Sequence, residues 1–365
     1  MGKVLFINHT NDLFGAERVL VKAIQASGLA PSDIIVVEPD YHPDSAFRDA
    51  VTDAGYEVIR LSYKNLGGSL LRSLLVWLYN LLAVFRLRRI VHKEGVGCIW
   101  SNTSLCCLGV VTARLAGVRH VWHIHEPAEE AHDYVPRLKW LYKSLFAYPK
   151  NTFVFVTRKQ QGNWERLYPA LCGRSRLIYN PSETYQRHRV KDSLCRFGYL
   201  GSWSRRKNLP MLVEVFGQVH ELFPDTELLM AQNIGDDAER IRTLVATLPD
   251  PQAIRIEPVE DVQAFFDRID VLVLPSFSET WGIAAVEAML QGIATVVTRQ
   301  TALQEIAEDR TDIVYINPYD RQSLRDAMTE MCDEAFRRRI GTNGQRTMQA
   351  MNLNRRFAEG IKELL

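Results

Sequence analysis

The sequence lacks the features that mark several large classes of protein. Its 365 residues include only six cysteines, and no two of them are spaced as Cys-x-x-Cys, so neither a zinc site nor a redox pair is indicated. Two of the six are adjacent, which suits reduced thiols better than a disulfide framework. The first residues, MGKVLFINHT, lack the basic start and the apolar run of a signal peptide. We therefore expect a protein of a reducing compartment, the cytoplasm.

The remaining composition is typical of a soluble globular protein. Apolar residues make up 47% of the chain and charged residues 24%, close to the globular averages, and the length predicts two domains at roughly 150 residues each. The formal net charge of +1 gives no indication of nucleic-acid binding. The charge is unevenly divided, because residues 1–190 carry 24 basic and 16 acidic side chains whereas residues 191–365 carry 20 and 27. The first half therefore favours an anionic partner.

Short β-rich runs alternate with helical stretches along the chain. This alternation predicts parallel strands joined by right-handed helical crossovers. The expected strands are 3–7, 34–38, 57–61, 98–100, 120–124, 152–156, 196–200, 227–230, 253–256, 271–274, 294–297 and 313–316. The expected helices include 16–27, 105–116, 138–146, 209–222, 238–246, 282–290 and 322–331.

The alternation pauses around Tyr179-Asn180-Pro181 and the polar residues 182–192, where the charge balance also changes sign. We expect a first domain at 1–185, a second at 186–345, and a C-terminal helical segment at 346–365 that packs back on the first domain. The predicted fold class is α/β, with two Rossmann-like, doubly wound domains facing a central cleft. Ligands of such sheets bind beyond the carboxyl ends of the strands, so motifs that follow strands are the ones to search for chemistry.

One stretch combines an apolar run with a basic end. The thirteen residues 73–85 carry no charge and are followed by RLRRIVHK, which contains Arg86, Arg88, Arg89 and Lys93. Spanning a bilayer takes about 20 apolar residues, so this run is too short for a transmembrane helix. Two interpretations remain. The segment is either a crossover helix buried against a sheet, or an interfacial helix with its basic end at the headgroups of an anionic membrane.

The most informative phrase is PSFSETWGIAAVEAMLQGIATVVT, residues 275–298. An expected strand ends before it, a polar loop carries Glu279, and the helix expected from Gly282 places Glu287 in its second turn. The backbone N–H groups of residues 280–283 would then point out of the helix N-terminus, where a phosphate binds readily. The two glutamates would accept hydrogen bonds from sugar hydroxyls, as acidic residues do for ribose. The competing interpretation is that acidic residues near a helix start stabilise its dipole without any ligand.

Residues 275–298 resemble the donor-site signature of the family-4 retaining glycosyltransferases, also described as glycosyl transferases group 1. The shared features are Pro-Ser, two glutamates with seven residues between them, a glycine after the first glutamate, Ala-Met, and a glycine before a Val-rich strand. The resemblance covers most of the chain and implies the glycosyltransferase-B fold, in which two Rossmann-like domains face each other. It also implies that Glu287 binds the ribose of a nucleotide and that Glu279 lies near the transferred sugar.

Shorter motifs resemble the family in the expected order. Gly15, in NDLFGAE, takes the place of a family glycine whose backbone approaches the donor diphosphate, and Phe14 replaces the glycine that usually precedes it. His125 resembles the strand-end histidine that contacts the transferred sugar, although a histidine at a strand end also suits a purely structural role. Asn180 and Glu305 resemble the family's interdomain asparagine and the acidic residue after its Val-rich strand.

The segment GYLGSWSRRKN, residues 198–208, resembles the first donor loop of the family's second domain. Lys207 occupies the place of the family's lysine, but Ser202 stands where the family usually has an arginine, after Gly201. Positioned cations stabilise the negative charge that develops on a departing nucleoside diphosphate. Three outcomes are open: Arg205 or Arg206 compensates for the missing arginine, the activity is weak, or the basic triplet is only a solvated loop.

Absent motifs narrow the chemistry further. No Asp-x-Asp occurs, which argues against the metal-dependent glycosyltransferase fold, and the chain has neither G-x-G-x-x-G nor G-x-x-x-x-G-K-[ST]. We therefore expect no cofactor and no metal, with a nucleotide-diphosphate sugar as the substrate. The expected catalytic residues are His125, Lys207, Glu279 and Arg206. The expected donor-binding residues are Gly15, Gly201, Ser202, Arg205, Lys207, Glu279, Thr280, Trp281, Gly282, Ile283 and Glu287.

The function implied by the resemblance is the metal-independent transfer of a hexose, with retained anomeric configuration, to a glycan or lipid-linked acceptor in cell-surface polysaccharide synthesis. The expected partners are the donor, that acceptor and, on the interfacial interpretation, the inner face of an anionic membrane, but no nucleic acid. Two other functions stay open: a catalytically weakened homologue that acts as a binding or scaffold subunit, and a sugar-nucleotide epimerase of the same architecture. An epimerase would convert the sugar without any acceptor.

Overall fold

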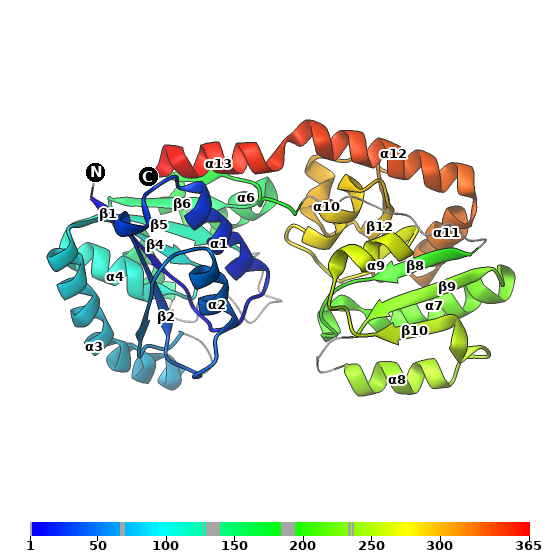
Figure 1. Ribbon diagram of the computed structural model, residues 1–365, viewed down its shortest axis with the longest axis horizontal. Helices are drawn as coiled ribbons and strands as arrows, with labels where there is room; N and C mark the ends of the chain where they lie inside the picture. The colour runs from blue at the N-terminus through cyan, green and yellow to red at the C-terminus, as the bar shows by residue number, and fades with distance from the viewer. Residues whose placement is uncertain are drawn as a thin grey trace. The chain divides into compact units, whose positions relative to one another are not determined.

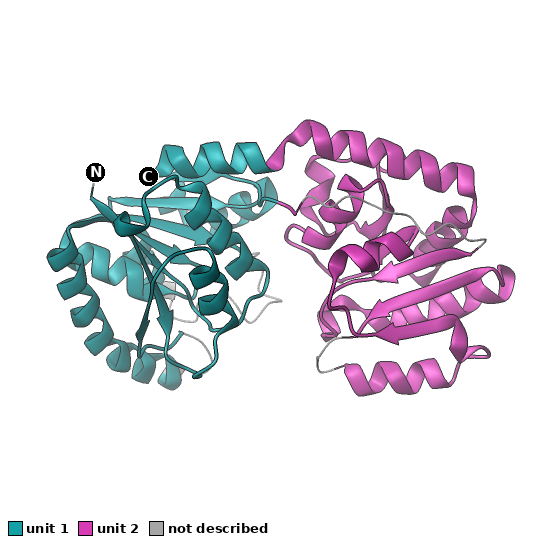
Figure 2. Ribbon diagram, viewed as in Figure 1, with its two compact units in different colours: residues 1–181, 354–365 teal, residues 182–353 magenta. Residues whose placement is uncertain are grey.

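The computed structural model describes residues 2–65, 70–126, 128, 139–183, 194–232, 235 and 237–365. The chain forms two compact units (Figures 1 and 2). Unit 1 comprises Met1–Pro181 together with Asn354–Leu365, and unit 2 comprises Ser182–Leu353. The expected domain boundary at 185 and most of the polar stretch 182–192 fall on residues outside the described ranges.

Unit 1 contains a parallel sheet whose described strands follow the order β3-β2-β1-β4-β5-β6-β7. The strands are largely buried apolar runs, because helices cover both faces of a parallel sheet. They are β1 (Lys3–Ile7), β2 (Ile34–Pro39), β3 (Val58–Leu61), β4 (Val96–Asn102), β5 (Arg119–Ile124), β6 (Asn151–Phe155) and β7 (Ser175–Leu177).

Helices pack on both faces of this sheet. Neighbouring residues of β1 belong to different cores: Leu5 and Ile7 lie in one apolar cluster, and Val4 and Phe6 in the other. The first cluster includes residues of α3, α4 and α5, and the second includes residues of α1, α2 and the C-terminal helix. The helices of unit 1 are α1 (Gly15–Ala26), α2 (Ala46–Asp53), α3 (Leu70–Glu94), α4 (Cys107–Ala116), α5 (Lys139–Phe146) and α6 (Arg158–Leu167), with the 3-10 turns η1 (Pro31–Asp33) and η2 (Pro169–Leu171).

The C-terminal helix α13 (Leu353–Leu364) returns to unit 1. Its Phe357 and Ile361 are buried in the second apolar cluster, and the guanidinium of Arg119 donates hydrogen bonds to the carbonyl oxygens of Leu364 and Leu365. The last described residues of the chain therefore contribute to the core of the unit that the first residues build.

Unit 2 repeats the architecture. Its described strands follow the order β10-β9-β8-β11-β12-β13, again all parallel. The strands are β8 (Cys195–Tyr199), β9 (Thr226–Ala231), β10 (Ile254–Glu257), β11 (Val271–Leu274), β12 (Ala294–Thr298) and β13 (Val314–Ile316). The helices are α7 (Leu209–Leu222), α8 (Ala238–Ala246), α9 (Val262–Arg268), α10 (Ile283–Leu290), α11 (Arg321–Cys332) and α12 (Glu334–Met351), with the 3-10 turns η3 (Arg205–Lys207), η4 (Pro251–Ala253) and η5 (Ala302–Glu305).

The two sheets confirm the predicted α/β class and place the strand-end motifs. In each unit the strand order reverses beside the first strand, between β1 and β4 and between β8 and β11. At such a switch point the two flanking loops leave in opposite directions and open a crevice at the carboxyl ends of the strands. The segments 8–15 and 200–208 follow β1 and β8, and 275–282 follows β11. These are the segments that the sequence motifs singled out.

Candidate functional site

A charged cluster lies at the switch point of unit 2, where the loops after β8 and β11 meet. Lys207 forms an ion pair with Glu279 through its Nζ and the Oε1 of the glutamate. The hydroxyl of Ser276 donates to the same carboxylate at 2.7 Å. The Nη1 atom of Arg206 lies 3.7 Å from Oε2 of Glu279 and donates to the carbonyl of Ser278 at 2.7 Å. Two basic groups and one acidic group thus converge on one point.

The backbone holds the two loops together. Asn208 adopts a left-handed conformation, with φ of +55°, at the start of α7, a conformation that asparagine tolerates better than most residues. Its side-chain amide donates to the carbonyl of Pro275 at 3.3 Å and to that of Pro318 at 2.9 Å. The backbone N–H of Phe277 donates to the carbonyl of Arg206 at 2.9 Å. Lys207 and Arg206 are therefore fixed beside the segment that carries Glu279.

Opposing effects determine the protonation of Glu279. Burial would raise the pKa of this carboxyl group, but the nearby cations Lys207 and Arg206 and the hydrogen bonds from Lys207 and Ser276 outweigh it, so the pKa lies below its usual value. The carboxylate is therefore ionised at neutral pH. With Lys207 and Arg206 the cluster carries a net charge of one positive unit, which favours an anionic ligand.

The helix that follows this cluster presents its N-terminus to the same loop. Gly282 has φ of +75°, a backbone conformation that suits glycine, and α10 begins at Ile283. The first N–H groups of a helix have no acceptor within it and favour negative charge. Trp281 is buried, with 3% of its surface exposed, and Glu287 lies in the second turn with 8% exposed. The N–H of Glu183 lies 3.5 Å from Oε1 of Glu287.

The loop after β8 requires a glycine at 201. A β-carbon at Gly201 would lie 2.8 Å from the hydroxyl oxygen of Tyr199, closer than real β-carbons come. That hydroxyl donates to the carbonyl of Ser202 at 2.7 Å. The side chains of Ser202 and Arg205 are exposed, and the Ser202 hydroxyl lies 3.4 Å from that of Ser204. Of the two arginines considered as substitutes, Arg206 contacts the charged cluster.

A second cluster lies at the switch point of unit 1. Nε2 of His125 lies 3.0 Å from Oδ1 of Asn102, the last residue of β4. The amide nitrogen of Asn102 donates to Asn8 at 3.1 Å and to the carbonyl of Ala16 at 3.3 Å. Ala16 follows Gly15, the first residue of α1. Asn102 therefore connects His125 to the helix start that carries Gly15.

Burial dominates the electrostatics of this second cluster. It lowers the pKa of His123 to about 3 and that of His125 well below its usual value. Burial also raises the pKa of Glu126, whose carboxylate accepts the N–H of Ser104 at 3.0 Å. Neither ring nitrogen of His123 has a hydrogen-bond partner among the described residues. Asn102, His123 and His125, the neutral cluster of unit 1, therefore carry no charge at neutral pH.

The structure groups the predicted site residues in two sets. Unit 2 brings together Lys207, Arg206 and Glu279 and places residues 280–283 directly after them, whereas Gly15 and His125 belong to unit 1. Sequence reasoning did not assign roles to Ser276 and Asn102. Ser276 was part of the quoted Pro-Ser motif, and Asn102 ends a buried strand, so position alone could have marked both.

The described residues contain neither a metal-binding group nor a membrane-spanning helix. No group of three or more His, Cys, Asp or Glu side chains is placed to hold a metal ion in the part of the chain that the structure describes. Within the same residues, every helix is too short or too polar to cross a membrane.

Comparison with known proteins gives a family match within unit 2. Residues 195–334 match the model of the family described as "Glycosyl transferases group 1". A D-inositol 3-phosphate glycosyltransferase of Corynebacterium kroppenstedtii is 24% identical over 149 residues, which cover 38% of this chain and 33% of that protein. The match thus spans about a third of the length of this curated relative.

Solved structures resemble the chain over its full length. HepE of Anabaena, in a crystal structure with UDP-glucose, superposes with a TM-score of 0.81 at 16% identity and 100% coverage of both chains. The apo form of WaaB, a lipopolysaccharide outer core galactosyltransferase, gives a TM-score of 0.73 at 12% identity, again with 100% coverage of both chains. At these identities the likeness shows a shared fold.

Proposed function

We propose that this protein transfers a hexose from a nucleotide-diphosphate sugar to a glycan or lipid-linked acceptor, with the anomeric configuration retained. The match of residues 195–334 to the model of the glycosyl transferases group 1 and the glycosyltransferase-B fold of the chain support this proposal. The observation that carries the proposal is the cluster of Lys207, Arg206 and Glu279 at the switch point of the unit that matches the family. WaaB and the complex of HepE with UDP-glucose support a nucleotide-sugar donor and a role in cell-surface polysaccharide synthesis.

The charged cluster is suited to a diphosphate leaving group. As the bond between sugar and phosphate breaks, negative charge develops on the departing oxygen, and fixed cations near that oxygen lower the barrier. Lys207 and Arg206 supply the charge, and Glu279 together with the backbone contacts keeps them in place before the donor binds. The N-terminus of α10 adds N–H groups that favour phosphate oxygens. Metal ions are not needed in this arrangement.

The two glutamates take different roles in the proposal. Glu287, in the second turn of α10, would accept hydrogen bonds from the ribose hydroxyls of the nucleotide. Glu279 is ionised and already engaged with Lys207 and Ser276, so it would orient the lysine and approach the transferred sugar. In a same-face displacement the departing phosphate takes the proton of the acceptor hydroxyl, which requires no separate carboxylate base.

The neutral cluster of unit 1 would meet the sugar and the acceptor. His125 is uncharged and hydrogen-bonded to Asn102, so it would exchange neutral hydrogen bonds with sugar hydroxyls instead of attracting phosphate. Gly15 begins α1 and leaves its backbone without a side chain in the way. This division assigns charge neutralisation to unit 2 and sugar recognition to unit 1.

Ser202 keeps a second function open, a weakened homologue that binds the donor without turning it over. Its side chain is exposed and adds no cation where the family usually has an arginine. Release of nucleoside diphosphate from UDP-, GDP- and ADP-hexoses, measured with EDTA and with and without acceptor glycolipids, separates the possibilities. We expect acceptor-dependent release that survives EDTA, and a product whose anomeric configuration, determined by NMR, matches the donor.

Other outcomes of this assay would identify other functions. Binding of the donor without release of nucleoside diphosphate would indicate the scaffold subunit. Conversion of the donor sugar without release would indicate an epimerase. Activity that disappears with EDTA and returns with magnesium or manganese would contradict the metal-free arrangement.

A further inference from the structure

Helix α3 (Leu70–Glu94) separates its residues into two faces. Val76, Ala83, Leu87 and Val91 are buried against the core of unit 1, and in Figure 1 the helix lies beside α4 at the edge of that unit. A crossover helix needs only this inner apolar stripe. The predicted buried crossover helix is therefore present, but it accounts for one face alone.

The opposite face of α3 is apolar as well. Among the described residues, eight of the seventeen exposed large apolar side chains lie on this helix. Six of them lie on one side of the helix, at positions 71, 74 and 75, 78, 82 and 85: Leu71, Leu74, Leu75, Leu78, Leu82 and Phe85, with exposed fractions between 44% and 72%. At 3.6 residues per turn these side chains lie on the side away from the core. Soluble proteins rarely leave so many apolar groups together in water without a partner.

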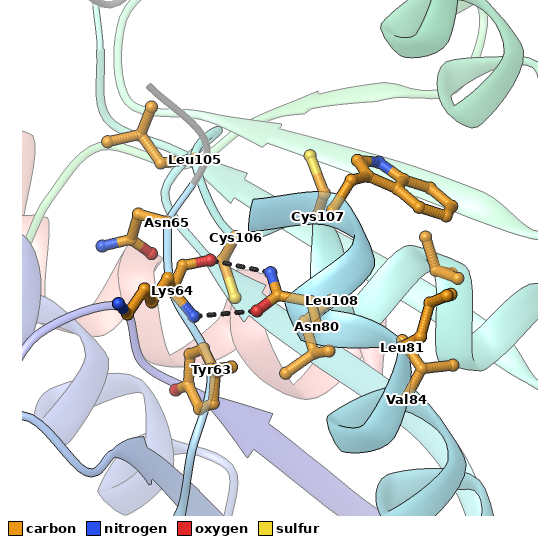
Figure 3. Close-up of a pocket in the computed structure, with 12 residues that line it drawn as sticks. Tyr63, Lys64, Asn65, Asn80, Leu81, Val84, Leu105, Cys106, Cys107 and Leu108 are labelled. Atoms are coloured by element: carbon orange, nitrogen blue, oxygen red, sulfur yellow. Dashed lines mark hydrogen bonds between the residues drawn. The ribbon is translucent and has the colours of Figure 1, made fainter. Parts of the chain in front are cut away.

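A pocket on the inner side of α3 does not account for the exposed apolar residues of the outer face. Figure 3 shows the pocket between α3 and the start of α4, where the side chain of Asn80 pairs with both backbone groups of Lys64. Its cavity measures about 20 Å³, which is room for about one water molecule. It is too small for a lipid chain, and it does not cover the apolar residues of the outer face.

The same outer face becomes basic toward the end of the helix. Arg86, Arg89 and Lys93 continue the exposed side, with Arg88 at its margin, and all four side chains are exposed. The only acidic residue of α3 is Glu94, at its last position. A shallow hollow on this surface is lined by Phe85, Arg88, Arg89, His92 and Lys93. One face therefore combines about four apolar turns with two cationic turns.

We propose that this face of α3 docks on an anionic lipid bilayer, with Leu74, Leu75, Leu78, Leu82 and Phe85 among the acyl chains and Arg86, Arg89 and Lys93 at the headgroups. The distribution of charge on α3 argues against a second copy of the chain as the partner of this face. A parallel pair of α3 helices would place arginines against arginines, and an antiparallel pair would place arginines against leucines. Anionic headgroups above an apolar interior complement both halves of the face. The proposal stands on this surface and does not depend on sugar transfer.

Sedimentation of the full chain with vesicles tests the docking. The probes are vesicles of phosphatidylglycerol with phosphatidylcholine, and vesicles of phosphatidylcholine alone. We expect binding to the anionic vesicles that weakens with salt. The triple variant in which Gln replaces Arg86, Arg88 and Arg89 should bind the anionic vesicles on the order of a hundredfold more weakly. The change Leu75, Leu78, Leu82→Ser should remove the binding that persists at high salt.

Matched controls separate docking from general effects. The change Arg338, Arg346, Arg356→Gln removes three exposed arginines from other helices, and Leu222→Ser removes an exposed leucine from α7. Both should bind vesicles like the wild type, and circular dichroism should show that all variants are folded. Absence of binding at low salt would overturn the proposal, as would equal binding by all variants. So would a dimer, seen by light scattering, that only the leucine change of α3 dissociates.

Discussion

The two units have the same topology at their switch points and opposite electrostatics. In unit 2, burial would raise the pKa of Glu279, but the nearby cations Lys207 and Arg206 have the larger combined effect, so the pKa of this carboxyl group is lowered. In unit 1, burial is the largest influence on both groups, so it lowers the pKa of His123 and raises that of Glu126. The difference lies in the partners, because a carboxylate stays charged when cations are within a few ångströms. The same fold thus carries a charged cluster at one switch point and uncharged histidines at the equivalent position of the other unit.

Acid should affect unit 1 first, and this is the largest effect we expect. The pKa values of His120 and His123 are lowered to about 3 by burial, so below pH 6.5 the unfolded chain binds protons that the folded unit does not. Each histidine then reduces the stability of unit 1 by up to about 1.4 kcal/mol per pH unit. As the pH falls from 6.5 to 4.5, His9, with a pKa of about 4, lowers the stability of unit 1, and Glu17, with a pKa of about 7, raises it. These two contributions to stability nearly cancel.

Unit 2 should keep its stability over the same range. Because the pKa of Glu279 lies below 4.5, its contribution is present above that pH and is lost only as the pH falls further. Hydrogen exchange followed by mass spectrometry, corrected for the intrinsic rate at each pH, should show unit 1 losing protection between pH 6.5 and 4.5 while unit 2 does not. Earlier loss in unit 2 would mean that burial does not neutralise the histidines of unit 1.

Removing the lysine should have the next largest effect. Lys207→Ala deletes the cation that faces Glu279, and loss of one such stabilising group costs about a hundredfold to a thousandfold in turnover. Lys207→Arg keeps the charge and should retain more activity than the alanine variant. Thermal unfolding of both proteins checks that the fold survives. Equal turnover in wild type and alanine variant would remove Lys207 from the chemistry.

The arginines should differ, with a smaller effect. Arg206 contacts Ser278 and approaches Glu279, so Arg206→Ala should reduce turnover by more than tenfold, about 1.4 kcal/mol in the barrier. Arg205→Ala should reduce turnover by less, since Arg206 is the arginine beside Glu279. Ser202→Arg, which restores the usual family residue, should rescue the Arg206 variant in part. Full activity of both alanine variants would disprove compensation for Ser202.

Much of the fold could be predicted from the sequence because buried parallel strands are continuous apolar runs. Four elements have the predicted bounds: Lys3–Ile7, Leu209–Leu222, Ala238–Ala246 and Val271–Leu274. The other predicted strands and helices differ by one or two residues at one or both ends. The edge strand β7 (Ser175–Leu177) was not among the predicted strands, since its three residues are neither apolar throughout nor fully buried. The strand order was also not predicted, because periodicity within a segment carries no information about its neighbours.

The site was predicted only in part. Lys207 and Glu279 are 72 positions apart, and no local pattern connects them, so only the family resemblance placed both at one site. The resemblance carried no information on Ser276, which anchors the carboxylate, or on Asn102, which connects His125 to the start of α1. Both are short polar side chains at strand ends, and their partners come from distant parts of the chain.

Binding of UDP to two single variants tests the division between the units. Glu287→Ala removes a charge-assisted hydrogen bond from unit 2, worth about 1.5–3 kcal/mol, and should weaken UDP binding tenfold or more in calorimetry. His125→Ala, in the neutral cluster of unit 1, should leave the affinity for UDP, which carries no sugar to be transferred, within about twofold, well under 1.4 kcal/mol. Unchanged affinity in a folded Glu287 variant, or a larger loss in the His125 variant, would contradict the assignment of the nucleotide to unit 2.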